Sequence, residues 1–269
     1  MTACSILKLS LLSVLRDPTY SAGVFLMTLL GFVLYASLVL LPIYLQTLLG
    51  YPAFQAGLAI SPRGLGALLT TPIAGVLTHK LGPRKLLLFG FTVGAFTMWQ
   101  LAGLNLNAGY WDVFWPQVTQ GCALSFLFIP LMAATMSRIR KEHMGNATSI
   151  FNLMRNIGGS FGIALMTTFL ARRNQVHQNH LISNINVYDP ETWRMLQSAR
   201  AWFQGRGSDA YTATQQAYGA IYGMVQRHAA MLSFVEAFWV MAVLFALMVP
   251  VVFVLRPAPL HENNSAPMH

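Results

Sequence analysis

Residues 41–85 read LPIYLQTLLGYPAFQAGLAISPRGLGALLTTPIAGVLTHKLGPRK. An apolar run ends near Gln46, a short turn follows, and a second run of about 25 residues begins at Ala53, long enough to cross a bilayer. Pro62, Arg63 and Pro72 lie inside that second run. A buried arginine costs about 2.5–3.5 kcal/mol on membrane-insertion scales, so we expect it to face a cavity or a partner. The stretch therefore predicts a membrane helix that lines a transport path.

The composition places the whole chain among membrane proteins. It is 55% hydrophobic and only 9% charged, whereas about a quarter of the residues of a soluble domain are charged. The formal net charge of +9 sits mostly in short turns between apolar runs. Membrane topology explains that distribution better than nucleic-acid binding does, so we expect no nucleic-acid partner.

No pattern in the sequence indicates catalysis, a metal or a cofactor. Cys4 lies near the N-terminus and Cys122 in an apolar run, which makes a disulfide framework implausible. The seven histidines are scattered rather than set at metal-ligand spacing. Neither a phosphate-binding glycine loop nor a nucleophile elbow is present. We therefore expect no catalytic residues, no metal and no cofactor, and a protein that is not an enzyme.

Apolar runs of about 20 residues predict six membrane spans and an all-α polytopic fold. The spans are expected at residues 20–45, 53–77, 85–104, 113–136, 147–170 and 229–255. Residues 1–19 are expected to form either an interfacial helix or a linker, and residues 256–269 a polar tail. Gly158, Gly159 and Gly162 should let the fifth span pack closely against a neighbouring helix.

The distribution of Lys and Arg predicts the orientation. Basic residues precede the first span and follow the second, fourth and sixth, whereas the alternate short turns, at 46–52 and 105–112, carry none. By the positive-inside rule both termini are then cytoplasmic, in a multi-pass protein of the inner (plasma) membrane.

Residues 171–228 are expected to form a long, partly helical periplasmic loop. One short amphipathic helix should begin after Asp189 at Pro190 and end at Gly205. It would lie either at the outer membrane surface, over the mouth of a pore, or in solvent as an ordinary loop helix. A second helix, capped by Ser208 or Asp209, should continue into the last span.

Three motifs resemble the major facilitator superfamily, and more narrowly its fourteen-span drug:proton antiporters of the EmrB/QacA type. They are PIYLQ with GY, G and SPRG (within 42–64), GVLTHKLGPRK (75–85) and FNLMRNIGGSFG (151–162). The second is similar to the superfamily's cytoplasmic loop motif, with Gly75, Lys80, Gly82, Arg84 and Lys85 at matching positions. His79 stands where that motif usually has an acid, so these basic residues serve either gating or positive-inside anchoring.

The resemblance matches the C-terminal six-span half of such a transporter, built from two inverted three-helix repeats. It implies proton-coupled efflux of small hydrophobic or cationic compounds by alternating access. The implied partners are the lipid bilayer, H⁺, and either an N-terminal half or a second copy of the chain. The alternative is a truncated or split-gene remnant that does not transport without a separate N-terminal half.

Polar residues inside the spans are the candidate site. Gln46, Arg63, Asn152 and Arg155 are expected to line a cavity and contact substrate, or else to serve helix packing. Arg63 and Arg155 lie on spans that the inverted repeat makes equivalent. Glu236 is expected to carry a proton or to form an ion pair, with Arg63 or with an arginine of the outer loop.

Overall fold

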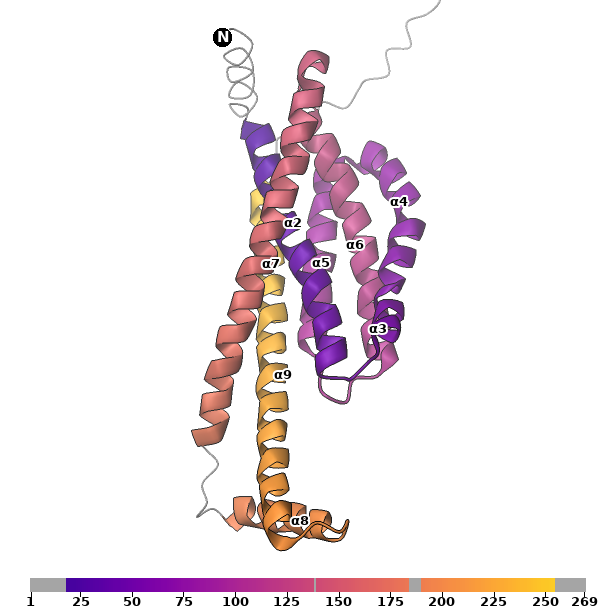
Figure 1. Ribbon diagram of the computed structural model, residues 1–269. Coiled ribbons are helices and arrows are strands. Elements are labelled where there is room, and N and C mark those ends of the chain that lie inside the picture. The colour runs from indigo at the N-terminus through magenta and orange to yellow at the C-terminus, as the bar shows by residue number, and fades with distance from the viewer. Residues whose placement is uncertain (1–17, 138, 184–189, 255–269) are drawn as a thin grey trace, which may run out of the picture.

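The computed structural model describes residues 18–137, 139–183 and 190–254. Over these residues the protein is all α-helical, without strands. The helices are α2 (Pro18–Thr47), α3 (Ala53–Ile60), α4 (Pro62–Leu81), α5 (Pro83–Ala102), α6 (Tyr110–Met136), α7 (Met144–Ser183), α8 (Pro190–Gln204) and α9 (Ala210–Val252), with a 3-10 turn η1 at Lys141–His143. Figure 1 shows a bundle from which α7 and α9 project at one end. The predicted N-terminal segment, apart from its last two residues, and the predicted C-terminal tail lie outside the described residues.

The helices of the bundle differ in how apolar they are. In the described part of the chain, α2, α5, α6 and α9 are long and apolar enough to cross a bilayer. The other two predicted spans, α4 and α7, do not meet that standard, because α4 carries Arg63 and Lys80 and α7 carries Asn152, Arg155 and Asn156. They pack most extensively against α6 and α2 respectively. Their polar residues therefore need protein rather than lipid around them.

The second predicted span is broken near its start. Ser61 separates α3 from α4, and Pro62 is the first residue of α4, where the missing proline N–H costs no helical hydrogen bond. The Ser61 N–H donates to the Gly57 carbonyl at 3.0 Å, which keeps the two helices close to continuous. This break places Arg63 in the first turn of α4.

α2 and α7 touch through their backbones. A Cβ atom at Gly158 of α7 would lie less than 3.0 Å from the carbonyl oxygen of Thr28 on α2. A Cβ atom at Gly31 of α2 would lie equally close to the carbonyl oxygen of Arg155 on α7. Gly162 meets the carbonyl of Phe32 one turn further along in the same way. Only glycine permits such an approach.

The same contacts recur between α4 and α6. Gly66 of α4 lies against the carbonyl oxygen of Val118 on α6, and Gly121 of α6 lies against the carbonyl oxygen of Arg63 on α4. In the α2–α7 pair, Gly31 meets the carbonyl of Arg155, and Gly158, three residues after Arg155, meets the carbonyl three residues before Gly31. In the α6–α4 pair, Gly121 meets the carbonyl of Arg63, and Gly66, three residues after Arg63, meets the carbonyl three residues before Gly121. The pairs α2–α7 and α6–α4 are therefore equivalent, position by position.

This equivalence fits two inverted repeats, α2–α4–α5 and α6–α7–α9. Successive long helices alternate in direction along the bundle, so α6 runs opposite to α2 (Figure 1). The third helices of the two repeats, α5 and α9, pack against each other. Gly94 faces the ring of Phe245, and the Phe91 and Phe245 ring centroids lie 6.2 Å apart.

The expected outer loop is mostly an extension of two long helices. α7 does not end near Leu170 as predicted but continues to Ser183, since no proline or glycine interrupts residues 171–183. α9 begins at Ala210 and runs without a break into the predicted last span. Asp209 caps it, and hydrogen bonds from Thr212, first of all from its side chain, hold the pKa of Asp209 below its usual value.

α8 begins at Pro190 and ends at Gln204, as the sequence predicts. It packs across the start of α9, at the far end of the extension (Figure 1). Arg227 of α9 donates to the Leu48 carbonyl at the end of the bundle, with Nη2 at 2.6 Å and Nε at 3.2 Å. At 1.5 Å per residue, the part of α9 before Arg227 projects about 25 Å from that level. α8 therefore lies well away from the end of the bundle at Leu48.

The backbone contacts predict a large difference between two glycine substitutions. Gly158→Ala would force α7 away from α2, and overpacking of this kind costs about 1–3 kcal/mol. Gly219→Ala lies in α9 with nothing within 4 Å of the added Cβ, and alanine is favoured over glycine in a helix by about 0.5–1 kcal/mol. We expect a lower thermal unfolding temperature in detergent for Gly158→Ala only. Equal unfolding temperatures for both variants would contradict the close approach.

Candidate functional site: a buried arginine and an outer ion-pair cluster

Arg63 lies in a polar network between α4, α6 and α2. Its Nε donates to Oε1 of Gln117 at 3.1 Å, and its Nη2 donates to Oε1 of Gln120 at 2.5 Å. Nε2 of Gln120 donates in turn to Oγ of Ser37 on α2 at 3.2 Å. Gln117 and Gln120 are three residues apart on α6 and so share one helix face. The network joins three helices through one guanidinium.

The charge of Arg63 has no carboxylate partner among the described residues. The residue is only 8% exposed, and its hydrogen-bond acceptors are neutral amide oxygens. Its Nη1 and Nε2 of Gln117 are buried without a hydrogen-bond partner in the described part of the protein. Unpaired buried donors are costly and are commonly satisfied by an ordered water. The site is a positive centre with two unused donors.

Arg155 occupies the equivalent position but has different surroundings. The residues of α2 that correspond to Gln117 and Gln120, counted from the equivalent glycines, are Met27 and Leu30. Arg155 consequently has no amide oxygens to bind there. Its guanidinium carbon instead lies 5.9 Å from the ring centroid of Phe128, and its Nε is buried without a hydrogen-bond partner in the described structure.

The four predicted cavity residues do not form one cluster. Gln46 is exposed in the last turn of α2. The side chain of Asn152 donates to the Thr148 carbonyl of its own helix at 3.1 Å. Arg63 is buried against α6, whereas Arg155 is only partly buried on α7. No hydrogen bond or ion pair joins any two of the four within the described residues.

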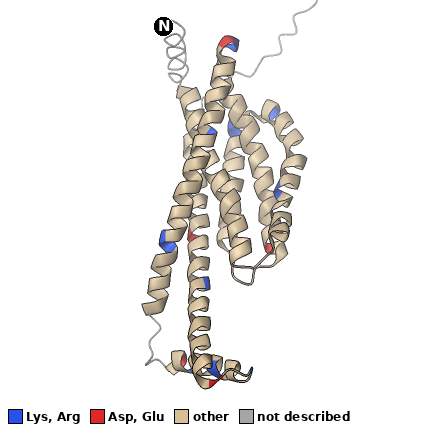
Figure 2. Ribbon diagram, viewed as in Figure 1, with Lys and Arg blue, Asp and Glu red and all other residues tan. Residues whose placement is uncertain are grey.

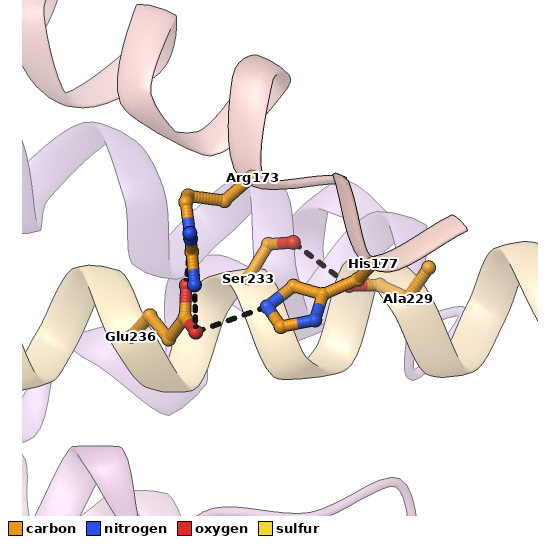
Figure 3. A network of polar contacts seen from close by, with 5 residues as sticks. All are labelled: Arg173, His177, Ala229, Ser233 and Glu236. Atoms are coloured by element: carbon orange, nitrogen blue, oxygen red, sulfur yellow. Dashed lines mark hydrogen bonds and ion pairs between the residues drawn. The ribbon is translucent and has the colours of Figure 1, made fainter. Parts of the chain in front are cut away.

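Glu236 lies in a second polar cluster, shown in Figure 3, where α7 crosses α9. Nη2 of Arg173 donates to Oε1 of Glu236 at 2.5 Å, and Nε of Arg173 pairs with Oε2. Nε2 of His177 lies 3.0 Å from Oε1 of the same carboxylate. Of the two partners that the sequence left open for this acid, the structure pairs it with the arginine beyond the fifth predicted span and not with Arg63. The cluster joins α7 to α9 within the bundle, nine residues along α9 from Arg227.

Comparison with known proteins places this architecture in a family. Residues 5–163 match the family model described as Major Facilitator Superfamily. The chain belongs to the Major Facilitator Superfamily. Membership in this superfamily of membrane transport proteins indicates a multi-pass membrane protein rather than an enzyme.

Its relatives within the superfamily include exporters. The chain is 30% identical over 247 residues to the multidrug export protein EmrB of Escherichia coli K12, covering 91% of this chain and 47% of the relative. It is 38% identical over 181 residues to EmrB of Haemophilus influenzae, covering 66% and 35%. It is 29% identical over 255 residues to the fatty acid resistance protein FarB of Neisseria gonorrhoeae, covering 94% and 48%. The chain spans about half the length of the curated relatives it matches.

The superfamily loop motif lies where α4 turns into α5. Gly82 has a φ of 82°, a conformation that favours glycine, and Pro83 then starts α5. The guanidinium carbon of Arg84 lies 4.7 Å from the ring centroid of Phe253, just beyond the end of α9. Lys80 and Lys85 are exposed, and a Cβ at Gly75 would meet nothing within 4 Å. Figure 2 shows that charged residues are sparse along the bundle and gather toward its ends and on α8.

The sequence does not predict the partners of Arg63, and it leaves open which outer-loop arginine pairs with Glu236. Gln117 and Gln120 could have been found as two amides at helical spacing in an otherwise apolar span. The sequence predicts Arg173 and His177 to lie in the outer loop, because it carries no sign that α7 continues past the apolar run. The pairing of His177 with Glu236 follows from that continuation.

The different surroundings of the two arginines predict different effects of removing them. Arg63→Leu leaves the side-chain oxygens of Gln117 and Gln120 buried without donors, at about 1–3 kcal/mol each. Arg155→Leu removes a guanidinium that binds no side-chain acceptor in the described structure and should cost much less. Thermal unfolding in detergent compares the two variants. A similar loss of stability for both would show that the amide network does not distinguish them.

The cluster at Glu236 predicts a local change in dynamics. Glu236→Gln removes the charge that holds Arg173, and partly exposed ion pairs contribute up to about 1 kcal/mol. Hydrogen exchange in residues 171–183 should then be up to about fivefold faster, with the bundle unchanged. Glu142→Gln, at an exposed position of η1, is the matched control. Unchanged exchange in 171–183 would mean that the cluster does not hold α7 to α9.

Proposed function

We propose that the chain is the C-terminal half of a proton-coupled exporter of small hydrophobic or cationic compounds. The observation that carries the proposal is the equivalence of the two arginine-bearing helix pairs, because inverted repeats of this kind are the units of alternating-access transporters. The relatives named for multidrug export and for fatty acid resistance support small and largely apolar substrates.

The exposed faces of α4 and α7 support a partner that covers them. Large apolar side chains, among them Leu68 of α4 and Phe161 of α7, are exposed on these helices. They alternate with exposed polar ones such as Thr71, Asn156 and Ser160. A lipid-facing surface is expected to be apolar, whereas a mixed surface suits a cavity between two protein halves. We propose that an N-terminal half, rather than a second copy, covers these two helices and completes the substrate path.

The position of Glu236 bears on where protons are carried. Within the bundle it is already paired with Arg173 and faces His177, so taking up a proton there would break an ion pair. A homodimer would place only the same paired acid in both halves. We propose that the acids that carry protons during transport come mainly from the N-terminal half.

The proposed orientation has both ends of the chain in the cytoplasm, in the bacterial inner membrane. The turn from α4 to α5 lies at the end of the bundle opposite the extension (Figure 1) and carries Lys80, Arg84 and Lys85. Positive residues in short turns favour the cytoplasmic side. α8 and the projecting parts of α7 and α9 would then lie in the periplasm.

The second candidate function is a remnant that does not transport by itself. It is favoured by the mixed, uncovered faces of α4 and α7, which one six-helix unit leaves open. Under this alternative, too, the chain folds and inserts, but no substrate moves without a separate N-terminal half.

Reconstitution tests the proposal directly. Proteoliposomes would contain the 269-residue chain, a cognate N-terminal half, or both, and would be given a proton gradient and a fluorescent cationic dye. We expect gradient-dependent dye movement only with both halves together, since the path lies between them. Dye movement by the chain alone would contradict the need for a partner half. An absence of movement with both halves present would contradict the transport function.

A further inference from the structure

A pocket of about 390 Å³ lies at the end of the bundle that carries the extension, apart from Arg63 and Glu236. It is formed by the end of α5, the connection at 103–109 and the first turns of α6. The connection is fixed to α2, because the hydroxyl of Tyr44 donates to the carbonyl of Asn105 at 2.9 Å. The pocket is therefore part of the folded bundle rather than a gap beside a loose loop.

Two tryptophans and one acid line this pocket. Trp111 and Trp115 lie one helical turn apart on α6 and are 64% and 60% exposed. Asp112 lies between them in sequence, and its Oδ2 accepts a hydrogen bond from the Gly109 N–H at 2.8 Å. That bond holds the carboxylate in place among the residues that line the pocket. Asp112 is the lone acidic residue between positions 18 and 141, in a chain of net charge +9.

The wall of the pocket also holds an unused hydrogen-bond acceptor. Gln100 lines the pocket from α5, and its Oε1 is buried without a donor in the described part of the protein. A buried acceptor without a partner is costly. A ligand, or a water held by a ligand, that brings an N–H or O–H group to this wall removes that cost.

We propose that this pocket binds an alkylammonium group, with the carboxylate of Asp112 and the ring faces of Trp111 and Trp115 as its main contacts. Tryptophan is the aromatic residue that attracts cations most strongly, and quaternary ammonium groups are bound by aromatic cages. Tryptophans at a membrane interface also anchor a protein to the headgroup region. Anchoring alone requires neither a pocket nor an acid between the rings. This inference does not depend on transport.

Two sources supply this chemistry. One is the ammonium headgroup of phosphatidylethanolamine, which lies at the depth where interfacial tryptophans are found. The other is a soluble quaternary ammonium compound that reaches the pocket from the aqueous side. Both present a positive charge surrounded by alkyl groups or hydrogens, so the same three side chains serve either one.

Asp112→Asn tests the effect of the negative charge alone, because asparagine keeps an oxygen that can accept the Gly109 hydrogen bond. Asp209→Asn is the matched control, since Asp209 also caps a helix, α9, and lies outside the pocket. Trp115→Leu removes one ring face as a second variant. All variants are made in the full chain and compared by thermal unfolding, so that a misfolded protein is recognised.

Two probes distinguish the sources. Equilibrium dialysis of the detergent-solubilised chain with radiolabelled tetraethylammonium measures the soluble source. Native mass spectrometry after exposure to phosphatidylethanolamine or phosphatidylglycerol measures the lipid source. For at least one probe we expect Asp112→Asn and Trp115→Leu to weaken binding tenfold or more while Asp209→Asn does not. Phosphatidylglycerol lacks the ammonium group, so Asp112→Asn should not weaken its binding. Unchanged affinity of Asp112→Asn for both probes, or no binding of either by the unmodified chain, would overturn the assignment.

Discussion

Four equivalent glycine-to-carbonyl contacts, two in each helix pair, hold the two pairs of this protein together, and the rest of the bundle depends on them. With a side chain at Gly31, Gly66, Gly121 or Gly158, the backbones could not approach as they do. Two of these contacts fall on the carbonyls of the arginines themselves. The packing that closes each pair thus also sets the direction in which a charged side chain leaves the helix. The same glycine contacts therefore determine both how closely the helices approach and where the arginine side chains are placed.

The two helix pairs share the same backbone packing, but different side chains surround the arginine in each. Around Arg63 the neighbouring helix supplies Gln117 and Gln120, and the guanidinium is buried. Around Arg155 the same positions of the neighbouring helix are the apolar Met27 and Leu30, and the guanidinium stays partly exposed. Arg63 is thus held by two amide oxygens of a neighbouring helix, whereas Arg155 lies beside the ring of Phe128.

Much of this fold could be predicted from the sequence, because its strongest signals are physical. Apolar runs located the long helices, Pro190 and Gly205 marked the ends of α8, and the family motifs indicated the superfamily. The extent of α7 could not be predicted, since residues 171–183 are polar and their helix is held partly by Arg173 and His177 facing Glu236 on α9. The surroundings of Arg63 were missed for a related reason. Its partners lie 54 and 57 residues away, and no local pattern specifies them.

The central claim is that Arg63 and Arg155 occupy equivalent positions in two equivalent helix pairs, and disulfide cross-linking tests it most directly. The hydroxyls of Thr71 and Ser125 lie 3.0 Å apart between α4 and α6. Counted from the arginines and glycines, the equivalent positions on α7 and α2 are Ile163 and Tyr35. In a chain without its native cysteines, oxidation should link Cys pairs at 71/125 and at 35/163, but not at 35 with position 167 one turn further on. Cross-linking at 71/125 without 35/163, or preferential linkage of 35 to Thr167→Cys, would contradict the equivalence.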